Sequence, residues 1–163
     1  MSKTLAFVIE HQQQTEWCWA AVSKSVSTFF DSAAGWTQCA IVNSEMGRSD
    51  CCTKGGSPFC NCTWYLERAL QRVSKFRNML NSPSDRLTVR GEVDISNPMG
   101  ARILWARGGG HFVALYGYDD SDPDHLLVVV GDPWYGASIV DFDTFTTNYL
   151  GMGSWTHSYF TRP

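Results

Sequence analysis

The sequence predicts an α+β protein, with a helical lobe over about residues 1–85 and an antiparallel sheet lobe over about residues 86–163. In the first half, apolar residues recur at helical spacing; in the second half, short β-type runs are separated by Gly, Pro and Asp. The chain has 163 residues, of which 44% are hydrophobic, and this is enough for one sizeable core. We therefore expect a single domain over residues 1–163, built of two lobes.

Three helices are expected in the first lobe. Within residues 17–30 the apolar side chains recur at steps of three and four, which is typical of a helix packed on a core. A second helix is expected over residues 38–46, with Thr37 as its N-cap and Gly47 as its stop. A third is expected over residues 64–80.

Short strands are expected in the second lobe, after a breaker at residues 81–85. Residues 111–118 have apolar side chains on both faces, so this strand is expected at the centre of the sheet. The expected strands cover residues 87–92, 101–106, 111–118, 126–130, 138–142 and 155–160.

The composition argues against several functions. Only 18% of the residues are charged and the net charge is −3, so the chain lacks the basic excess of a nucleic-acid binder. The longest aliphatic run, residues 126–130, is far too short to cross a bilayer, so no membrane partner is expected. The apolar stretch at residues 5–9 is too short for a secretory signal, so export by the general secretory route is not expected.

Cys18 is the first candidate for chemistry. It is expected at the start of the first helix, where free backbone N–H groups and the helix dipole favour a thiolate. The alternative is a small buried hydrophobe between Trp17 and Trp19.

His111 and Asp132 are the candidates for a proton partner and its support. His111 follows three glycines and opens the expected central strand, whereas Asp132 ends the strand that pairs with it across a hairpin. We therefore expect the two side chains to meet. The alternatives are a core histidine bonded to a backbone carbonyl and an Asp-Pro turn. The remaining histidines are expected at the surface: His11, His125 and His157.

These candidates together resemble the papain-like cysteine peptidase superfamily. The resemblance rests on Gln12, the run Cys18-Trp19-Ala20-Ala21, the run Gly110-His111-Phe112-Val113 and the run Asp132-Pro133-Trp134. More narrowly, the chain is similar to the bacterial branch that contains staphopains, bacteriocin leader peptidases and the small effector proteases of plant-pathogenic bacteria.

Further segments make the effector-like group the most similar, and they extend the resemblance over nearly the whole chain. They are Glu16-Trp17 before the cysteine, residues 38–43, the Cys51-Cys52 pair and residues 102–105 before the histidine. The resemblance implies a papain-like fold, with the active-site cleft between the helical lobe and the sheet lobe.

The resemblance also implies roles for four residues. Cys18 would be the nucleophile, His111 the general base and acid, Asp132 the residue that orients the imidazole, and Gln12 the side-chain donor of the oxyanion hole. The implied activity is a cysteine endopeptidase that hydrolyses peptide bonds through a thioester, with no metal and no cofactor. The chain departs from papain in having Asp where papain has Asn, which leaves the triad intact and the substrate subsites open.

The biological setting also follows from the resemblance. Proteins of this type are similar to effector or antibacterial toxin domains that a specialised secretion system delivers into another cell, after a period in the producer's cytoplasm. The implied partners are a protein or peptide substrate and an immunity or inhibitor protein that covers the cleft.

Three alternatives stay open. The first is a peptidase that processes leader peptides, and the second is a transglutaminase- or deamidase-type acyl transferase on the same triad. The third is a binding module without activity that exposes Trp17, Trp36 or Trp134 as an interaction patch.

The other cysteines leave their redox state open. The spacing of Cys51, Cys52, Cys60 and Cys62 is unlike the usual zinc spacings, so disulfides or free thiols are favoured there over a structural zinc site. The pairing cannot be read from the sequence. These cysteines are Cys39, Cys51, Cys52, Cys60 and Cys62.

Overall fold

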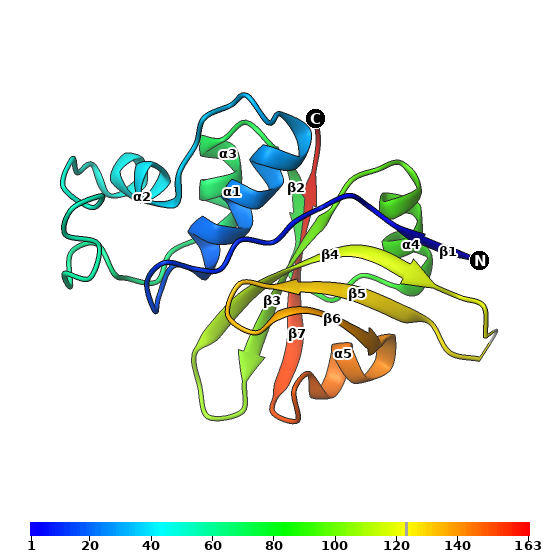
Figure 1. The fold of residues 1–163 in the computed structure, drawn as a ribbon. Helices are drawn as coiled ribbons and strands as arrows, with labels where there is room; N and C mark the ends of the chain where they lie inside the picture. The colour runs from blue at the N-terminus through cyan, green and yellow to red at the C-terminus, as the bar shows by residue number, and fades with distance from the viewer. Residues whose placement is uncertain (123) are drawn as a thin grey trace.

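A computed structural model describes residues 1–122 and 124–163. Within these residues the chain is α+β, with five helices and one seven-stranded antiparallel sheet in the order β2-β7-β3-β4-β5-β6, while β1 pairs with the far end of β4 (Figure 1). The strands are β1 (Ser2–Thr4), β2 (Phe76–Leu80), β3 (Met99–Trp105), β4 (Gly110–Asp119), β5 (Leu127–Asp132), β6 (Gly136–Asp141) and β7 (Gly153–Thr161).

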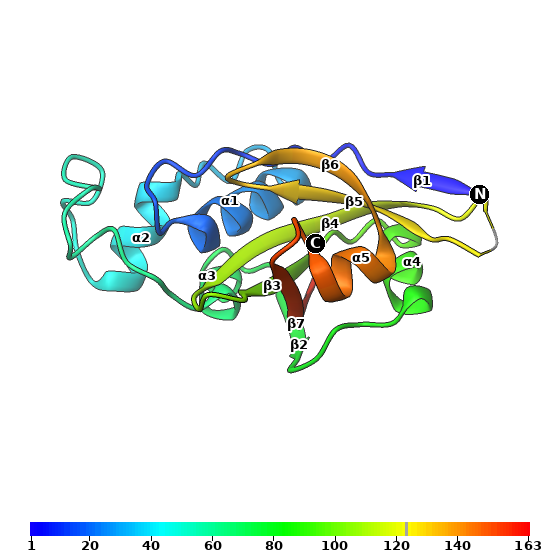
Figure 2. The ribbon, with the colours of Figure 1, turned by 90° about the horizontal axis from the view of Figure 1, so that it is seen from below.

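The helices form two groups. In both views α1, α2 and α3 lie together on one side of the molecule, and α4 and α5 lie away from them (Figures 1 and 2). The helices are α1 (Cys18–Phe30), α2 (Gln38–Met46), α3 (Leu66–Arg72), α4 (Arg86–Asp94) and α5 (Phe142–Asn148). None of the helices in the described part of the chain is both long enough and apolar enough to cross a bilayer.

Several expected elements are confirmed. Helix α1 begins at Cys18, and α2 is capped by Thr37, whose side chain accepts a hydrogen bond from the backbone N–H of Ala40 at 3.1 Å. Gly47 ends α2 in the left-handed conformation, at φ +63°. Strand β4 has neighbours on both sides and is buried on both faces over most of its length.

The third expected helix is wrong over its second half. Helix α3 ends at Arg72, Ser74 adopts a left-handed φ of +63°, and the chain continues as β2, which pairs with β7. Phe76 and Met79 are partly buried against the core from this strand. Because Phe76 and Met79 are three residues apart, the sequence pattern was compatible with a helix. Pairing of this segment with β7 stabilises a strand instead.

The expected strand at residues 87–92 is also wrong, because this segment lies within α4. The Asp85 carboxylate caps the helix by accepting a hydrogen bond from the N–H of Thr88 at 2.7 Å. Val89, Glu92 and Val93 are buried at helical spacing.

The predicted division into two lobes holds only in part. Strands β1 and β2 come from the first 85 residues and yet belong to the sheet, and α4 and α5 come from the second part. Helix α5 was not expected; Asp141 caps it by accepting from the N–H of Thr144 at 2.9 Å.

Close packing joins the helices to the sheet. Gly100 in β3 has no room for a side chain, because an added Cβ would lie 2.7 Å from Cδ2 of Leu66 in α3. Buried apolar residues from α1, α3 and the central strands belong to one continuous core. The start of α1 is thereby held firmly beside β4.

Candidate active site

Cys18 is the first residue of α1 and carries a free thiol that is 9% exposed. Trp17 occupies the N-cap position and provides no side-chain cap to the first turn. The N-terminal end of this 13-residue helix therefore presents free N–H groups and a partial positive charge beside the thiol. Reactive cysteines of other proteins are found in positions of this kind.

The residues on either side of Cys18 are fixed in place. The indole N–H of Trp17 donates to the carbonyl of Cys60 at 2.8 Å, and that of Trp19 donates to the carbonyl of Cys62 at 3.0 Å. Both indoles are fully buried. The cysteine thus has little freedom to move relative to the segment at residues 60–62.

His111 lies at the start of β4 and meets Asp132 at the end of β5. The antiparallel register pairs Ala114 with Gly131, which brings these two strand ends side by side. Nε2 of His111 lies 2.8 Å from Oδ1 of Asp132, and both side chains are buried. The expected meeting of the two side chains is therefore a feature of the structure.

The carboxylate of Asp132 determines where the imidazole proton lies. Burial raises the pKa of Asp132, but hydrogen bonds from His111 and from the backbone N–H groups of Trp134 and Tyr135 outweigh it and lower the pKa below its usual value. The ionised carboxylate can only accept, so Nε2 of His111 donates. This leaves Nδ1 as the ring nitrogen available to Cys18, which is among the groups that raise the pKa of His111.

The charge state of His111 follows from its two neighbours. Burial lowers the pKa of His111, but hydrogen bonds and charge from Asp132 and Cys18 outweigh burial and raise the pKa to about 9. The imidazolium is therefore the dominant form at neutral pH. A cationic histidine oriented by a carboxylate is suited to pair with a thiolate and to donate a proton.

Tyr149 also contacts Asp132, and sequence reasoning missed it. Its hydroxyl donates to Oδ2 of Asp132 at 2.9 Å, and the residue is 1% exposed. Tyr149 follows directly after α5, a helix that the sequence did not predict. No motif marks it, so only the fold brings it to the site.

Trp105 supports the same group of side chains. Its ring stacks on His111, with centroids 5.7 Å apart, and on Tyr149, with centroids 6.3 Å apart. Gly153 gives this indole its space, because an added Cβ would lie 2.5 Å from Ile103 and 2.7 Å from Trp105. The resemblance included Trp105 as part of a motif, but gave it no role.

Gln12 lies in the loop before α1 and is 3% exposed. Its Nε2 donates to the carbonyls of Gln14 at 2.9 Å and Thr15 at 2.7 Å, while its buried Oε1 has no partner in the described part of the chain. The backbone N–H of Gln12 donates to the carbonyl of Pro133 at 2.9 Å, so this loop is tied to the residue after Asp132. The two amide hydrogens are therefore directed at the loop in this structure.

Two cavities adjoin the candidate residues. The first, of about 400 Å³, includes Gln12 and His111 and has a largely apolar wall of Trp105, Trp134, Leu150 and Met152. The second, of about 750 Å³, includes Cys18, Trp19, Trp64, Gly110, Phe112, His157 and Tyr159. His157, expected at the surface, thus lines a cavity and is partly buried, whereas His11 and His125 are exposed.

The cysteines outside α1 are mostly paired. Disulfides join Cys39 to Cys52 and Cys51 to Cys60, and Cys62 is free. The neighbours Cys51 and Cys52 thus bond in opposite directions along the chain, Cys52 to an earlier cysteine and Cys51 to a later one. The sequence left this pairing open.

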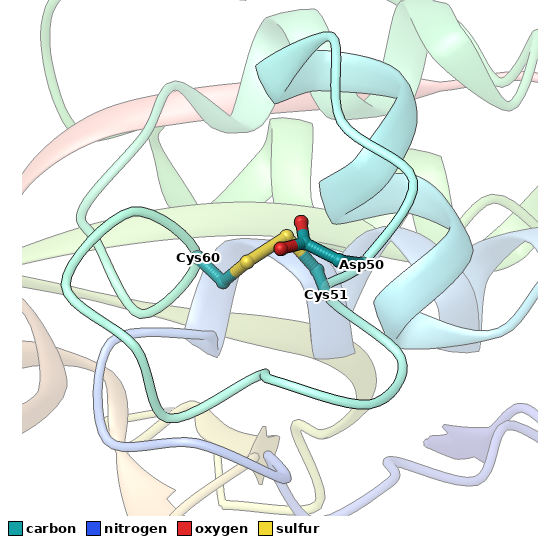
Figure 3. A group of neighbouring side chains, drawn as sticks. All are labelled: Asp50, Cys51 and Cys60. Atoms are coloured by element: carbon teal, nitrogen blue, oxygen red, sulfur yellow. A yellow bond between two sulfur atoms is a disulfide. The ribbon is translucent and has the colours of Figure 1, made fainter.

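The segment around Asp50 does not form a zinc site in this state. Figure 3 shows the Asp50 carboxylate beside the disulfide of Cys51 and Cys60, and the three candidate ligand atoms lie within 4.8 Å of one another. The two sulfurs are bonded to each other, so neither is a thiolate that could bind a metal. Asp50 instead accepts two hydrogen bonds at 2.9 Å from Arg48.

Asn61 connects the disulfide-bonded loop to the segment before Cys18. Its Oδ1 accepts from the N–H of Glu16 at 2.9 Å, and its Nδ2 donates to the hydroxyl of Thr15 at 2.8 Å. Together with the bonds from the two flanking indoles, four hydrogen bonds hold residues 15–19 against residues 60–62. The loop is therefore part of the support of Cys18.

The three tryptophans considered as an interaction patch do not share an exposed surface. Trp17 is 1% exposed and Trp36 is partly buried, while Trp134 is 44% exposed. The patch prediction is wrong for Trp17, because its indole belongs to the core and supports the site.

Comparison of the chain with models of known protein families found no match, and a search of curated proteins found no match either.

Proposed function

We propose that this protein is a papain-like cysteine endopeptidase that hydrolyses peptide bonds of a protein substrate. The observation that carries the proposal is the position of His111, whose Nε2 bonds to the buried carboxylate of Asp132 while Cys18 is near enough to help raise the pKa of its imidazole. A nucleophile, a proton carrier and a group that orients the carrier are thus connected in one chain of contacts.

The first half of the reaction uses the thiolate of Cys18. Its sulfur attacks the carbonyl carbon of the scissile peptide, a carbon–sulfur bond forms, and the carbonyl oxygen takes the negative charge. The imidazolium of His111 then transfers its Nδ1 proton to the amide nitrogen. The carbon–nitrogen bond breaks, the amine leaves, and a thioester remains on Cys18.

The second half uses water. Neutral His111 removes a proton from water as the oxygen attacks the thioester carbonyl. The carbon–sulfur bond breaks, the acid product leaves, and Cys18 and His111 return to the thiolate and imidazolium. Asp132 keeps the imidazole ring in one orientation throughout, and stabilises its positive form.

The oxyanion requires hydrogen-bond donors near Cys18. The N–H of Cys18, at the start of α1, is one donor, and Nε2 of Gln12 is the second. Gln12 would exchange its hydrogen bond to the carbonyl of Gln14 or Thr15 for one to the oxyanion. The exchange is favourable because hydrogen bonds to a charged acceptor are stronger than those to a neutral one.

Two features support a polypeptide substrate and a setting outside the producer's cytoplasm. Cavities border both His111 and Cys18, so an extended chain has room on both sides of the scissile bond. The two disulfides favour an oxidising environment. The resemblance to effector-like peptidases adds to the proposal a role as a bacterial effector or antibacterial toxin domain, with an immunity or inhibitor protein that covers the cleft.

Alkylation of the free thiols tests the nucleophile directly. Limiting iodoacetamide near pH 6 is expected to label Cys18 in the wild type and to label it far more slowly after His111→Ala. Cys62 is the matched control, since it is the second free thiol in the described part of the chain and burial raises its pKa. Equal labelling of both cysteines, or labelling of Cys18 that does not depend on His111, would contradict an activated thiolate.

Cleavage of a peptide library tests the reaction itself. The wild type and Cys62→Ser are expected to hydrolyse the same peptides, and Cys18→Ala is expected to hydrolyse none. Hydrolysis by Cys18→Ala would refute the mechanism, and transfer of the acyl group to an added amine without hydrolysis would favour an acyl transferase.

A further inference from the structure

Asp132 is a buried carboxylate whose two oxygens are used differently. Oδ1 accepts from Nε2 of His111 at 2.8 Å and from the N–H groups of Trp134 at 2.8 Å and Tyr135 at 3.0 Å. Oδ2 accepts from the hydroxyl of Tyr149 at 2.9 Å, which is its single hydrogen-bond donor among residues 1–122 and 124–163. Without that hydroxyl, Oδ2 would be a charged oxygen in the core with no partner, an arrangement that proteins rarely tolerate.

The structure holds Tyr149 in place independently of Asp132. Its backbone N–H and carbonyl exchange hydrogen bonds with Gly153 at 2.8 and 2.9 Å. Its ring packs edge-on against Phe145, with centroids 5.3 Å apart, and stacks on Trp105. A hydroxyl fixed in this way can define the plane of the carboxylate.

Trp105 gives Tyr149 a second connection to the imidazole. The indole lies against both rings, at interplanar angles of 24° to His111 and 19° to Tyr149. One path from Tyr149 to His111 thus runs through the Asp132 carboxylate, and the other runs through this stack. Both paths restrict the orientation of the imidazole.

Resting on the proposed peptidase function, we propose that Tyr149 is a positioning residue that sets the orientation of His111 through Asp132. It touches neither the substrate nor the thiol in this arrangement. Its hydroxyl holds the Asp132 carboxylate in a single orientation, in which Oδ1 faces Nε2 of His111. The imidazole is then oriented with Nδ1 toward Cys18. The proposal extends the expected triad by a fourth side chain.

Tyr149→Phe removes the hydroxyl and keeps the ring that packs on Trp105 and Phe145. The expected result is a fall in kcat of about tenfold to a hundredfold, since a hydrogen bond to a charged group is lost. KM is expected to stay within about twofold of the wild-type value, because a residue that only orients His111 adds no substrate contact.

Tyr118→Phe is a matched control. Tyr118 is equally buried at 1% exposed, and its hydroxyl donates to a carboxylate, Asp94, at 2.8 Å, in a part of β4 that pairs with β1. Tyr118→Phe removes the same chemical group from a bond to a carboxylate away from the site, although Asp94 is exposed and Asp132 is buried. The control is expected to keep the wild-type kcat, even where it lowers the unfolding temperature by as much as Tyr149→Phe.

A spectroscopic readout separates this proposal from the proposed function. By NMR, the imidazole N–H of His111 that faces Asp132 is expected to shift and to exchange faster with water in Tyr149→Phe, but not in Tyr118→Phe. These changes need no peptidase activity. If no peptide is cleaved but the resonance changes as expected, the peptidase proposal fails and the positioning role stands.

A second measurement needs no variant of Tyr149. In protein labelled at tyrosine, the Cζ resonance of Tyr149 is expected to follow the titration of His111 near pH 9, and that of Tyr118 is not. The proposal is overturned if Tyr149→Phe keeps the wild-type kcat and N–H resonance, if Tyr118→Phe lowers kcat equally, or if the Cζ resonance of Tyr149 ignores His111.

Discussion

The imidazole of His111 and the carboxylate of Asp132 face each other across neighbouring strands, with Nε2 and Oδ1 2.8 Å apart and both side chains at least nine-tenths buried. An ion pair this deeply buried is stabilising only while both groups are charged and bonded. The stability of the whole fold is therefore linked to the protonation of the histidine.

Stability is expected to fall in the alkaline range. The pKa of His111 is raised to about 9 from 6.5, so its contribution is fully present below about pH 6.5 and is lost as pH rises through 9. The difference corresponds to about 3 kcal/mol of unfolding free energy. Urea unfolding at pH 6 and pH 9.5 measures it, and His111→Gln is expected to remove most of the difference. If the unfolding free energy of His111→Gln falls as much between pH 6 and pH 9.5 as that of the wild type, other groups cause the pH dependence.

Gln12→Ala is expected to slow hydrolysis without abolishing it. Loss of one oxyanion donor raises the barrier by roughly 2–4 kcal/mol, and the N–H of Cys18 remains. Steady-state kinetics should show the loss in kcat. Gln13→Ala is the matched control, because the Gln13 side chain is exposed. Wild-type turnover by Gln12→Ala would exclude this amide from the oxyanion hole.

Removal of either disulfide is expected to lower both stability and activity. The Cys39–Cys52 and Cys51–Cys60 pairs close loops of 13 and 9 residues, and each contributes about 2–4 kcal/mol to folding. Activity falls because the loop that bonds to Trp17 and Trp19 loosens around Cys18. Double replacement of each pair by serine, followed by thermal unfolding and peptide hydrolysis, measures both effects.

Single replacement of the free Cys62 by serine is the control for those variants. Serine pairs that lose stability but retain full activity would show that the loop does not support the nucleophile.

Two glycines are expected to respond to alanine in opposite directions. Gly91 lies exposed within α4, where an added Cβ meets nothing within 4 Å, so Gly91→Ala should stabilise the protein by about 1 kcal/mol. Gly153→Ala should destabilise it, because the Cβ would clash with Ile103 and Trp105. Gly153→Ala should also reduce activity, since a displaced Trp105 disturbs His111. Melting temperatures and kcat of both variants check these expectations.

The sequence predicted the parts of the site that follow strand and helix ends. Cys18 at a helix start and His111 and Asp132 at neighbouring strand ends follow from local patterns, and the structure has all three positions. Tyr149 could not be found in this way, because it reaches Asp132 from a turn after a helix whose apolar pattern is short.

The errors in the fold have a common cause. Residues 76–80 and 87–92 are short segments in which helix and strand patterns coincide. Pairing with β7 makes residues 76–80 a strand, and the cap provided by Asp85 makes residues 87–92 part of a helix. In each case a contact outside the apolar pattern determines the conformation.

Because Cys51 and Cys52 are adjacent and bond to different partners, the chain could form more than one disulfide isomer when it is oxidised. Exchanging their partners, Cys60 and Cys39, would give an isomer of identical composition, so the correct isomer must be selected by packing during oxidation. The indole of Trp17 donates to the carbonyl of Cys60 and so favours the isomer in which Cys60 meets Cys51. Cys18 takes part in neither disulfide, so a chain with this pairing retains a free thiol at the start of α1.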